Sequence, residues 1–129
     1  MNGEPMRKIT LAVLSFALLA FPQGLTLTLK PGVFVREPYA CKDAPNAAIR
    51  VWDGAAFSGA GSSKCTTRVL SRQGEQFKIS TTCSALGDGT PDTSGYVEEI
   101  TLTRQSEKRF IISREGQPEG KYRWCGAKP

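Results

Sequence analysis

The chain of 129 residues contains no histidine, and this absence removes several kinds of chemistry at once. Ser-His-Asp and Cys-His catalytic arrangements need an imidazole, as do most general bases that titrate near neutral pH. Metal sites built from cysteine and histidine are excluded for the same reason. The four cysteines form no C-x-x-C pair, so a redox motif or a zinc ribbon does not fit either. We therefore expect no catalytic site of a familiar type, no metal ion and no cofactor.

The sequence also lacks an apolar run long enough to cross a bilayer. Its longest run, ITLAVLSFALLAF at residues 9–21, has 13 residues, whereas a membrane-spanning helix needs about 20. Arg7 and Lys8 precede this run, and a basic start followed by a short apolar stretch is typical of a secretory leader. We predict a leader over residues 1–20.

The site of cleavage follows from the small residues near the end of the run. Cleavage after Ala20 is the first expectation, and cleavage after Gly24 is the alternative. Translation begins at Met1 or at Met6, since MRKITLAVL is also a usual opening for a leader. We expect a periplasmic or secreted protein that keeps no stable membrane anchor once the leader is removed.

Acidic residues are the minority, with 12 Asp and Glu against 17 Lys and Arg. Loss of residues 1–20 removes Glu4, Arg7 and Lys8, which leaves 15 basic and 11 acidic side chains and a net charge of +4. A mild positive charge favours an anionic envelope ligand over a basic partner. The basic residues form no run, so we do not expect a nucleic-acid partner.

After the leader, no segment has the periodicity of a helix. Residues 21–31 predict an N-terminal arm or an edge strand, and residues 32–129 predict a single all-β domain. Its short apolar runs alternate with turn residues, which indicates an antiparallel barrel or sandwich of about seven or eight strands. The expected strands lie near Val33–Val35, Ile49–Val51, 55–59, Cys65–Ser71, Gln76–Cys83, Tyr96–Arg104, Arg109–Arg114 and Gly120–Cys125.

Turn signals predict the connections. Asp53-Gly54 is a strong hairpin signal. A turn over Gln73-Gly74-Glu75 would join the clearest strand pair. We expect two longer loops, Ser84–Gly95 and Gly59–Lys64, which are rich in turn residues and suited to recognition.

Four cysteines in an exported chain predict two disulfides that stabilise the fold. If Gln73-Gly74-Glu75 is the turn, Arg72 lies opposite Gln76 and Cys65 lies opposite Cys83, which leaves Cys41 to pair with Cys125. Cys41–Cys65 together with Cys83–Cys125 is the alternative, and the residues alone do not decide between them.

Trp52 is the first candidate for contact with a partner. It lies beside Arg50 on the strand face opposite Ile49 and Val51, although the same position suits a core residue. Asp88 and Asp92 lie in the predicted long loop as oxygen donors. Their segment D-G-T-P-D supplies too few ligands for a recognised calcium site.

The remaining charged residues predict no catalytic pair. Glu98 and Glu99 are adjacent on a strand and point to opposite faces, so they cannot act together as acid and base. Five arginines lie on predicted strands or strand ends and form either a cationic patch or a scattered set. They are Arg68, Arg72, Arg104, Arg109 and Arg114.

Three segments resemble a known family in their layout: Tyr39-Ala40-Cys41, the strand 49–53 and the C-terminal YRWCG. The arrangement is similar to that of the periplasmic inhibitors of c-type lysozymes, which are small β-barrels. The resemblance implies a bridge from the early Y-x-C cysteine to the late cysteine. The inhibitory motifs of that family are S-G-x-x-Y and W-x-K-G. Here Ser94-Gly95-Tyr96 has a different spacing and W-x-K-G is missing, so Ser94 and Tyr96 remain only candidate contacts.

Three functions compete on this sequence. The first is a non-enzymatic exported domain that binds a cell-envelope component or another exported protein. The second is an inhibitor of c-type lysozyme that reaches its target with a different loop. The third is an enzyme of unrecognised type that works without histidine.

Overall fold

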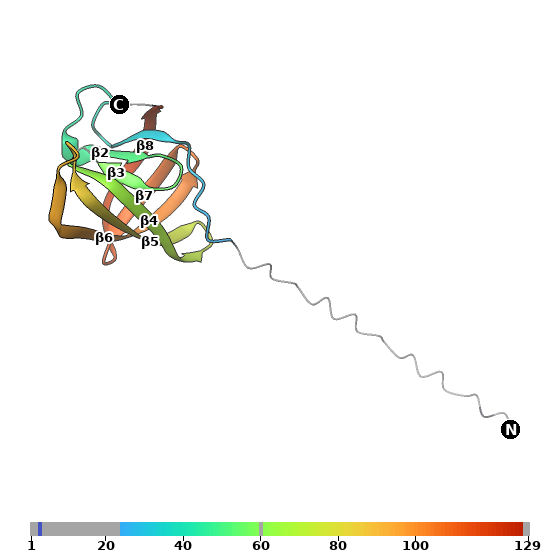
Figure 1. Ribbon diagram of the computed structural model, residues 1–129. Coiled ribbons are helices and arrows are strands. Elements are labelled where there is room, and N and C mark those ends of the chain that lie inside the picture. The colour runs from blue at the N-terminus through green and yellow to red at the C-terminus, as the bar shows by residue number, and fades with distance from the viewer. Residues whose placement is uncertain (1–2, 4–23, 60, 128–129) are drawn as a thin grey trace.

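The computed structural model describes Gly3, residues 24–59 and residues 61–127, and its regular structure is almost wholly antiparallel strand. Eight strands each pair with the next along the chain, and the last pairs with the first, so the sheet closes into a barrel (Figure 1). The predicted all-β fold is therefore confirmed, as a barrel. The strands are β1 (Gly32–Arg36), β2 (Ile49–Trp52), β3 (Phe57–Gly59), β4 (Ser62–Gln73), β5 (Gln76–Leu86), β6 (Pro91–Ser106), β7 (Arg109–Arg114) and β8 (Gln117–Gly126), with a short 3-10 turn η1 (Asn46–Ala48) before β2.

The seam between β1 and β8 closes the barrel and requires a glycine. Gly32 has a φ of +145°, and a Cβ at this position would lie 2.2 Å from the carbonyl oxygen of Gly126. Only a residue without a side chain permits that approach. Closure leaves no unpaired sheet edge at this seam, which protects the domain from edge-to-edge association.

The hairpin between β4 and β5 differs in detail from its prediction. Gln73 lies opposite Gln76, so the turn holds only Gly74 and Glu75, and the expected pairing of Arg72 with Gln76 is wrong. Gly74 has a φ of +61°, which suits the first position of a tight hairpin turn.

A β-bulge corrects the register of this hairpin. The pairing shifts between Val69 and Ser71, so Leu70 is the extra residue on β4. Beyond the bulge, Cys65 lies opposite Cys83, as predicted. The turn is one residue shorter than expected, and the bulge adds one residue to β4. The two differences compensate, which restores the expected pairing of Cys65 with Cys83.

The two expected long loops are mostly strand. The prediction of a loop over Ser84–Gly95 is wrong. β5 continues to Leu86 and β6 begins at Pro91, so only residues 87–90 form the turn. Pairing between β5 and β6 holds residues of turn-forming types in strands here. The extra residues of β6 before Tyr96 are accommodated by a register shift between Cys83 and Ala85. The second, Gly59–Lys64, is also mostly strand, because β3 ends at Gly59 and β4 begins at Ser62.

The segment before β1 closes one end of the barrel. Residues 24–31 lie outside any strand, and Leu27 and Leu29 insert among the core side chains with exposures of 6% and 5%. Arg104 Nε donates to the carbonyl of Thr28 at 2.6 Å, and the Lys30 amide donates to the carbonyl of Glu107 at 2.7 Å. We call this end, with the turns at 53–56, 74–75 and 107–108, the plugged end.

The opposite end is the open end, and it carries the connections at 37–48, 60–61, 87–90 and 115–116. Between the two ends, alternate residues of the strands fill the interior. On β5, for example, the buried positions recur at every second residue. The core consists of Leu27, Leu29, Phe34, Trp52, Phe57, Phe77, Ile79, Ile100, Leu102, Phe110, Ile112 and Tyr122.

Two disulfides join Cys41 to Cys125 and Cys65 to Cys83. The first of the two expected pairings is confirmed, and the alternative is wrong. Cys65–Cys83 links facing residues of β4 and β5, while Cys41–Cys125 fastens the β1–β2 connection to β8. Paired cysteines indicate that the protein folds in a non-reducing environment. In the described residues, no helix is both long and apolar enough to cross a membrane. The predicted leader lies outside the described residues, apart from Gly3.

Candidate functional site

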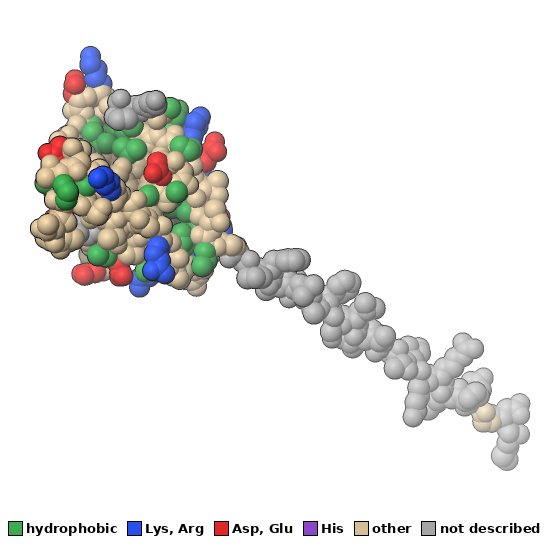
Figure 2. Space-filling model, viewed as in Figure 1, with side chains coloured by type: hydrophobic (Ala, Val, Ile, Leu, Met, Phe, Trp, Pro, Cys, Tyr) green, Lys and Arg blue, Asp and Glu red, His purple; other side chains and the backbone are tan. Residues whose placement is uncertain are grey.

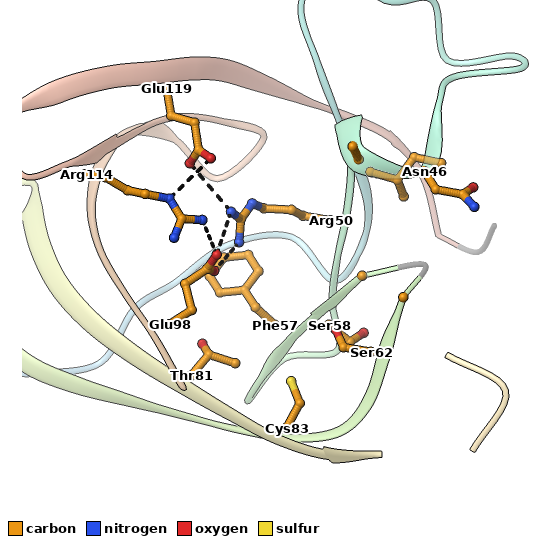
Figure 3. A pocket seen from close by; sticks show the side chains of 14 residues that line it. Asn46, Arg50, Phe57, Ser58, Ser62, Thr81, Cys83, Glu98, Arg114 and Glu119 are labelled. Carbon is orange, nitrogen blue, oxygen red and sulfur yellow. Dashed lines mark hydrogen bonds and ion pairs between the residues drawn. The ribbon is translucent and has the colours of Figure 1, made fainter. Parts of the chain in front are cut away.

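Four charged side chains meet inside the open end of the barrel: Arg50 of β2, Glu98 of β6, Arg114 of β7 and Glu119 of β8 (Figure 3). Arg50 Nη1 donates to Glu98 Oε1 at 2.7 Å, and Arg114 Nη2 donates to Glu98 Oε2. Arg114 Nε donates to Glu119 Oε1 at 3.3 Å, and Arg50 Nη2 lies 3.7 Å from Glu119 Oε2. Each arginine therefore contacts both carboxylates. We call these four residues the ion-pair network.

Strand alternation places three of the four inside the barrel. Side chains two residues apart on a strand share a face, so a charged residue two positions from core residues also points inward. Burial of such a charge is tolerated only where an opposite charge meets it. The nearest core residues on the same faces are Ile100 for Glu98, Ile112 for Arg114 and Trp52 for Arg50.

Glu119 reaches the network through a bulge. Ile112 pairs with Gly120, whereas Ser113 pairs with Pro118, so Glu119 is the extra residue on β8. A bulge re-aims the side chain of its extra residue and is common at the rim of a barrel. Without this insertion, the alternation that puts Tyr122 inside would place residue 119 on the outer face.

The network holds its charges in fixed states. Burial alone would raise the pKa of Glu98, but hydrogen bonds and charge from Arg50 and Arg114 outweigh it, so the pKa of Glu98 lies below its ordinary value. Burial alone would lower the pKa values of Arg50 and Arg114, but the contacts with Glu98 raise both. All three side chains are ionised at neutral pH.

A cavity of about 230 Å³ lies beside this network. Arg114 and Glu119 are its most accessible charged groups, because their side chains are 41% and 28% exposed against 15% for Arg50 and 10% for Glu98. Its remaining wall mixes polar and apolar groups. Thr81 lies near Glu98 in Figure 3, and Ala47, Ile49, Phe57 and Cys83 add apolar surface. Asn46, Ser58 and Ser62 add polar groups toward η1 and the start of β4.

Hydrogen bonds fix the wall of the cavity below the network. The hydroxyls of Thr67 and Thr81 lie 2.9 Å apart, and the Phe57 amide donates to the Thr67 hydroxyl at 2.9 Å. Phe57 is 2% exposed and packs against Trp52 and Phe110. Phe57 therefore joins the lining of the cavity to the aromatic core.

Trp52, the first candidate for partner contact, and its neighbour Arg50 have different surroundings in the structure. Trp52 is 4% exposed and packs against Phe57 with ring centroids 4.7 Å apart, so it is a core residue and the expectation of a partner contact is wrong. The inner face of β2 is the one that carries Arg50 and Trp52, while Ile49 and Val51 are half-buried on the other face. Arg50 lines the cavity as part of the network.

The predicted residues of the β5–β6 hairpin lie at the open end but do not form one site. Asp88 Oδ1 accepts a hydrogen bond from the Thr90 amide, and Asp92 Oδ1 accepts bonds from the amide and hydroxyl of Ser94. These hydrogen bonds lower the pKa of each aspartate. Of Tyr96 the structure describes only the backbone, which pairs with Cys83. Within the described ranges, no three Cys, Asp or Glu side chains approach closely enough to share a metal ion.

The five arginines considered above do not gather into one patch. Arg72 and Arg104 share Glu75 at the plugged end, at 3.4 and 3.5 Å. Arg109 pairs with Glu37 on the outside, whereas Arg114 belongs to the network. The sequence did carry a signal for the network, because Glu98 lies two residues before Ile100 on a core-facing strand side. The bulge that recruits Glu119 has no comparable signal.

Comparisons with known proteins leave the site to be interpreted from its own geometry. No family model matches this chain, and neither the curated proteins nor the solved structures give a match.

Proposed function

We propose that this chain is an exported, non-enzymatic binding domain, and that the cavity at the open end receives a polar group of its partner. The partner is a cell-envelope component or another exported protein. The observation that carries this proposal is the placement of the cavity: about 230 Å³ lie inside one end of the barrel, where two arginines and two carboxylates from four strands share the lining.

The size of the cavity limits what it can hold. Sites that enclose a drug-sized molecule measure about 300 to 1,000 Å³, so this one suits a small group at the end of a larger partner. Arg114 offers donors and Glu119 offers acceptor oxygens, with Ser58 and Ser62 beside them. A group that both donates and accepts hydrogen bonds fits this lining best.

The chemistry of the network supports binding rather than catalysis. A carboxylic acid that donates a proton at neutral pH needs a raised pKa, as in the acid residues of glycosidases. The pKa of Glu98 is lowered instead, and both of its oxygens are engaged by arginines. Fixed, mutually paired charges are suited to recognition, because they cost no rearrangement when a partner arrives.

Cavity filling tests the proposal. The full chain, exported and purified with its disulfides formed, is titrated with soluble glycopeptide fragments of the cell wall while backbone amide shifts are followed by NMR. We expect shifts confined to residues that line the cavity, and we expect S62F to abolish them. S71F is the matched control, since Ser71 lies on the same strand but is exposed near the plugged end. Shifts elsewhere, equal binding by S62F, or cleavage of the fragments would contradict the proposal.

Inhibition of c-type lysozyme is the second candidate. It is favoured by the closed barrel and by the Cys41–Cys125 bridge, which is the pairing that the resemblance implies. It ranks second because c-type lysozymes are basic and this chain is basic too, so electrostatic steering is lost. Submicromolar inhibition of lysozyme on bacterial cell walls by the oxidised chain is the expected result if this candidate is correct, and an inert, folded sample would remove it.

A further inference from the structure

A second surface, on the outer side of the barrel, collects the net charge of the molecule. It covers the outer side of β7 and β8 and continues to the plugged end around Trp124. We call it the basic face, and its cations are Lys30, Lys108, Arg109, Lys121 and Arg123.

Charge counting sets this face apart from the rest of the barrel. The described residues include 14 Lys and Arg and 11 Asp and Glu. The basic face holds five of these cations, with Glu37 and Glu107 as its neighbouring carboxylates, which leaves nine of each sign for the rest of the molecule. Charges of both signs are interspersed on the face shown in Figure 2. The described excess of three positive charges is therefore located on the basic face.

Two arginines on this face lie in an arrangement that disfavours folding. Arg109 and Arg123 are directly opposite each other on β7 and β8, on the outer side. Like charges at facing positions destabilise a sheet. Glu37 lies 3.4 Å from Arg109, whereas Arg123 donates to the carbonyl of Tyr39 at 2.7 Å, so the two facing guanidinium groups have one carboxylate and one backbone carbonyl as partners. An anionic partner would relieve the repulsion that remains.

Trp124 gives the face a second property. The ammonium groups of Lys30 and Lys108 lie 4.3 and 5.6 Å from the centre of its ring, while its indole nitrogen donates to the carbonyl of Pro31. A half-buried tryptophan flanked by lysines is the combination found where proteins meet the boundary between membrane and water.

The clustering of cations beside Trp124 favours a membrane surface as the partner. Lys30 belongs to the segment before β1, which crosses the plugged end, and both Lys30 and Lys108 lie over the ring of Trp124. Anionic headgroups at a bilayer surface attract clustered lysines and arginines.

We propose that the basic face docks on the phosphate groups of an anionic phospholipid bilayer. The contact is peripheral: the cations of β7, β8 and residue 30 lie against the headgroups, and Trp124 lies at the interface. The inference relies on the proposed export for access to a membrane surface, and it is independent of the cavity.

Vesicle binding by the exported full chain tests this proposal. The vesicles contain phosphatidylcholine alone, or about three parts of it to one part phosphatidylglycerol. We expect binding only to the anionic vesicles, and we expect it to be lost between about 0.05 M and about 0.5 M salt. Tryptophan fluorescence should change on binding. We assign this change to Trp124, because Trp52, the other tryptophan, is buried in the core.

Matched variants then locate the contact. R109Q/R123Q should weaken partitioning by about 25-fold, since each lost cation near the surface costs about fivefold. R68Q/K78Q removes the same charge from the outer side of β4 and β5 and should change partitioning by less than about threefold. An equal loss in both variants would assign binding to net charge, and equal binding to neutral vesicles would assign it to apolar contact. Binding to heparin without binding to vesicles would point to a soluble polyanion. Each of these outcomes overturns the proposal, and S62F separates it from the cavity, because S62F should bind vesicles normally.

Discussion

The two ends of this barrel are built from the same strands, but different kinds of side chain fill their interiors. At the plugged end, Leu27 and Leu29 complete an apolar core with contributions from nearly every strand. At the open end, the inward positions are occupied by the ion-pair network and by small hydroxyl side chains. Apolar burial stabilises without directional requirements, whereas buried ion pairs repay their desolvation only when their geometry is good. The difference indicates that stability comes mainly from the apolar end, and the proposed function assigns recognition to the open end.

The largest effect should come from the aromatic layer between the ends. Phe110 is fully buried and contacts the rings of Phe34, Phe57 and Tyr122. F110A should lower the free energy of unfolding by about 4 kcal/mol, measured by denaturant unfolding of the oxidised chain. I111A, on the outer side of the same strand, should cost less than half as much. Equal losses would show that the aromatic layer is not the main source of stability.

Breaking the network from one side should have the next largest effect. E98L leaves Arg50 and Arg114 without their shared carboxylate and should cost about 3 kcal/mol. The double variant R50M/E98L removes both charges of one pair and leaves Arg114 with Glu119, so it should recover at least half of that loss. E99L on the exposed side of β6 serves as the control. A double variant less stable than E98L would mean that the network itself stabilises the fold.

Removing part of the plug should have a smaller effect. L29A takes a 5%-exposed side chain out of the core and should cost about 2 kcal/mol, while also speeding proteolysis within residues 24–31. L25A is the matched control, since Leu25 is 54% exposed in the same segment. Arg72 Nη1 donates to the carbonyl of Gly24 at 3.0 Å, and Arg104 donates to that of Thr28. Unchanged proteolysis in L29A would show that these hydrogen bonds hold the segment without help from leucine.

Acid should weaken the open end by the smallest of these effects. The pKa of Glu98 is lowered in the folded state, so the unfolded chain binds more protons in the acidic range and stability rises with pH. This contribution is complete above the unfolded value of about 4.3 and is lost as the pH falls through the folded value. Denaturant midpoints between neutral and acidic pH should fall less steeply in E98Q than in E99Q. A residual slope is expected from Asp88 and Asp92, whose pKa values are also lowered.

Much of the barrel could be predicted from the sequence because its strands obey a strict two-residue period. The pairing of β4 with β5 follows from the turn signal between them, whereas the bridge between Cys65 and Cys83 was one of two pairings that the residues left open. The same period already placed Glu98 on the side of Ile100. Trp52 was placed correctly opposite Ile49 and Val51, but it was first expected to contact a partner because Ile49 and Val51 suit either face of a strand.

Bulges account for most of what local patterns could not predict. The extra residues at Leu70 and Glu119 change which side chains face inward, and no residue type marks them in the chain. The burial of Arg50 likewise depends on Glu98 and Glu119, which lie far along the chain and meet it only in the closed barrel. The basic face has the same origin, because Arg109 and Arg123 become neighbours only through strand pairing.

The bridge between Cys41 and Cys125 has a mechanical consequence. The two cysteines are 84 positions apart in the sequence, and the bridge closes the chain between them into a covalent ring. Strands β2 to β8 belong to this ring, whereas β1 lies before it. Tension applied through the chain ends would peel β1 and the segment before it, extending the chain by about 3.5 Å per freed residue, and would then stop at the disulfide. Strands β2 to β8 would carry no load until the bridge was reduced.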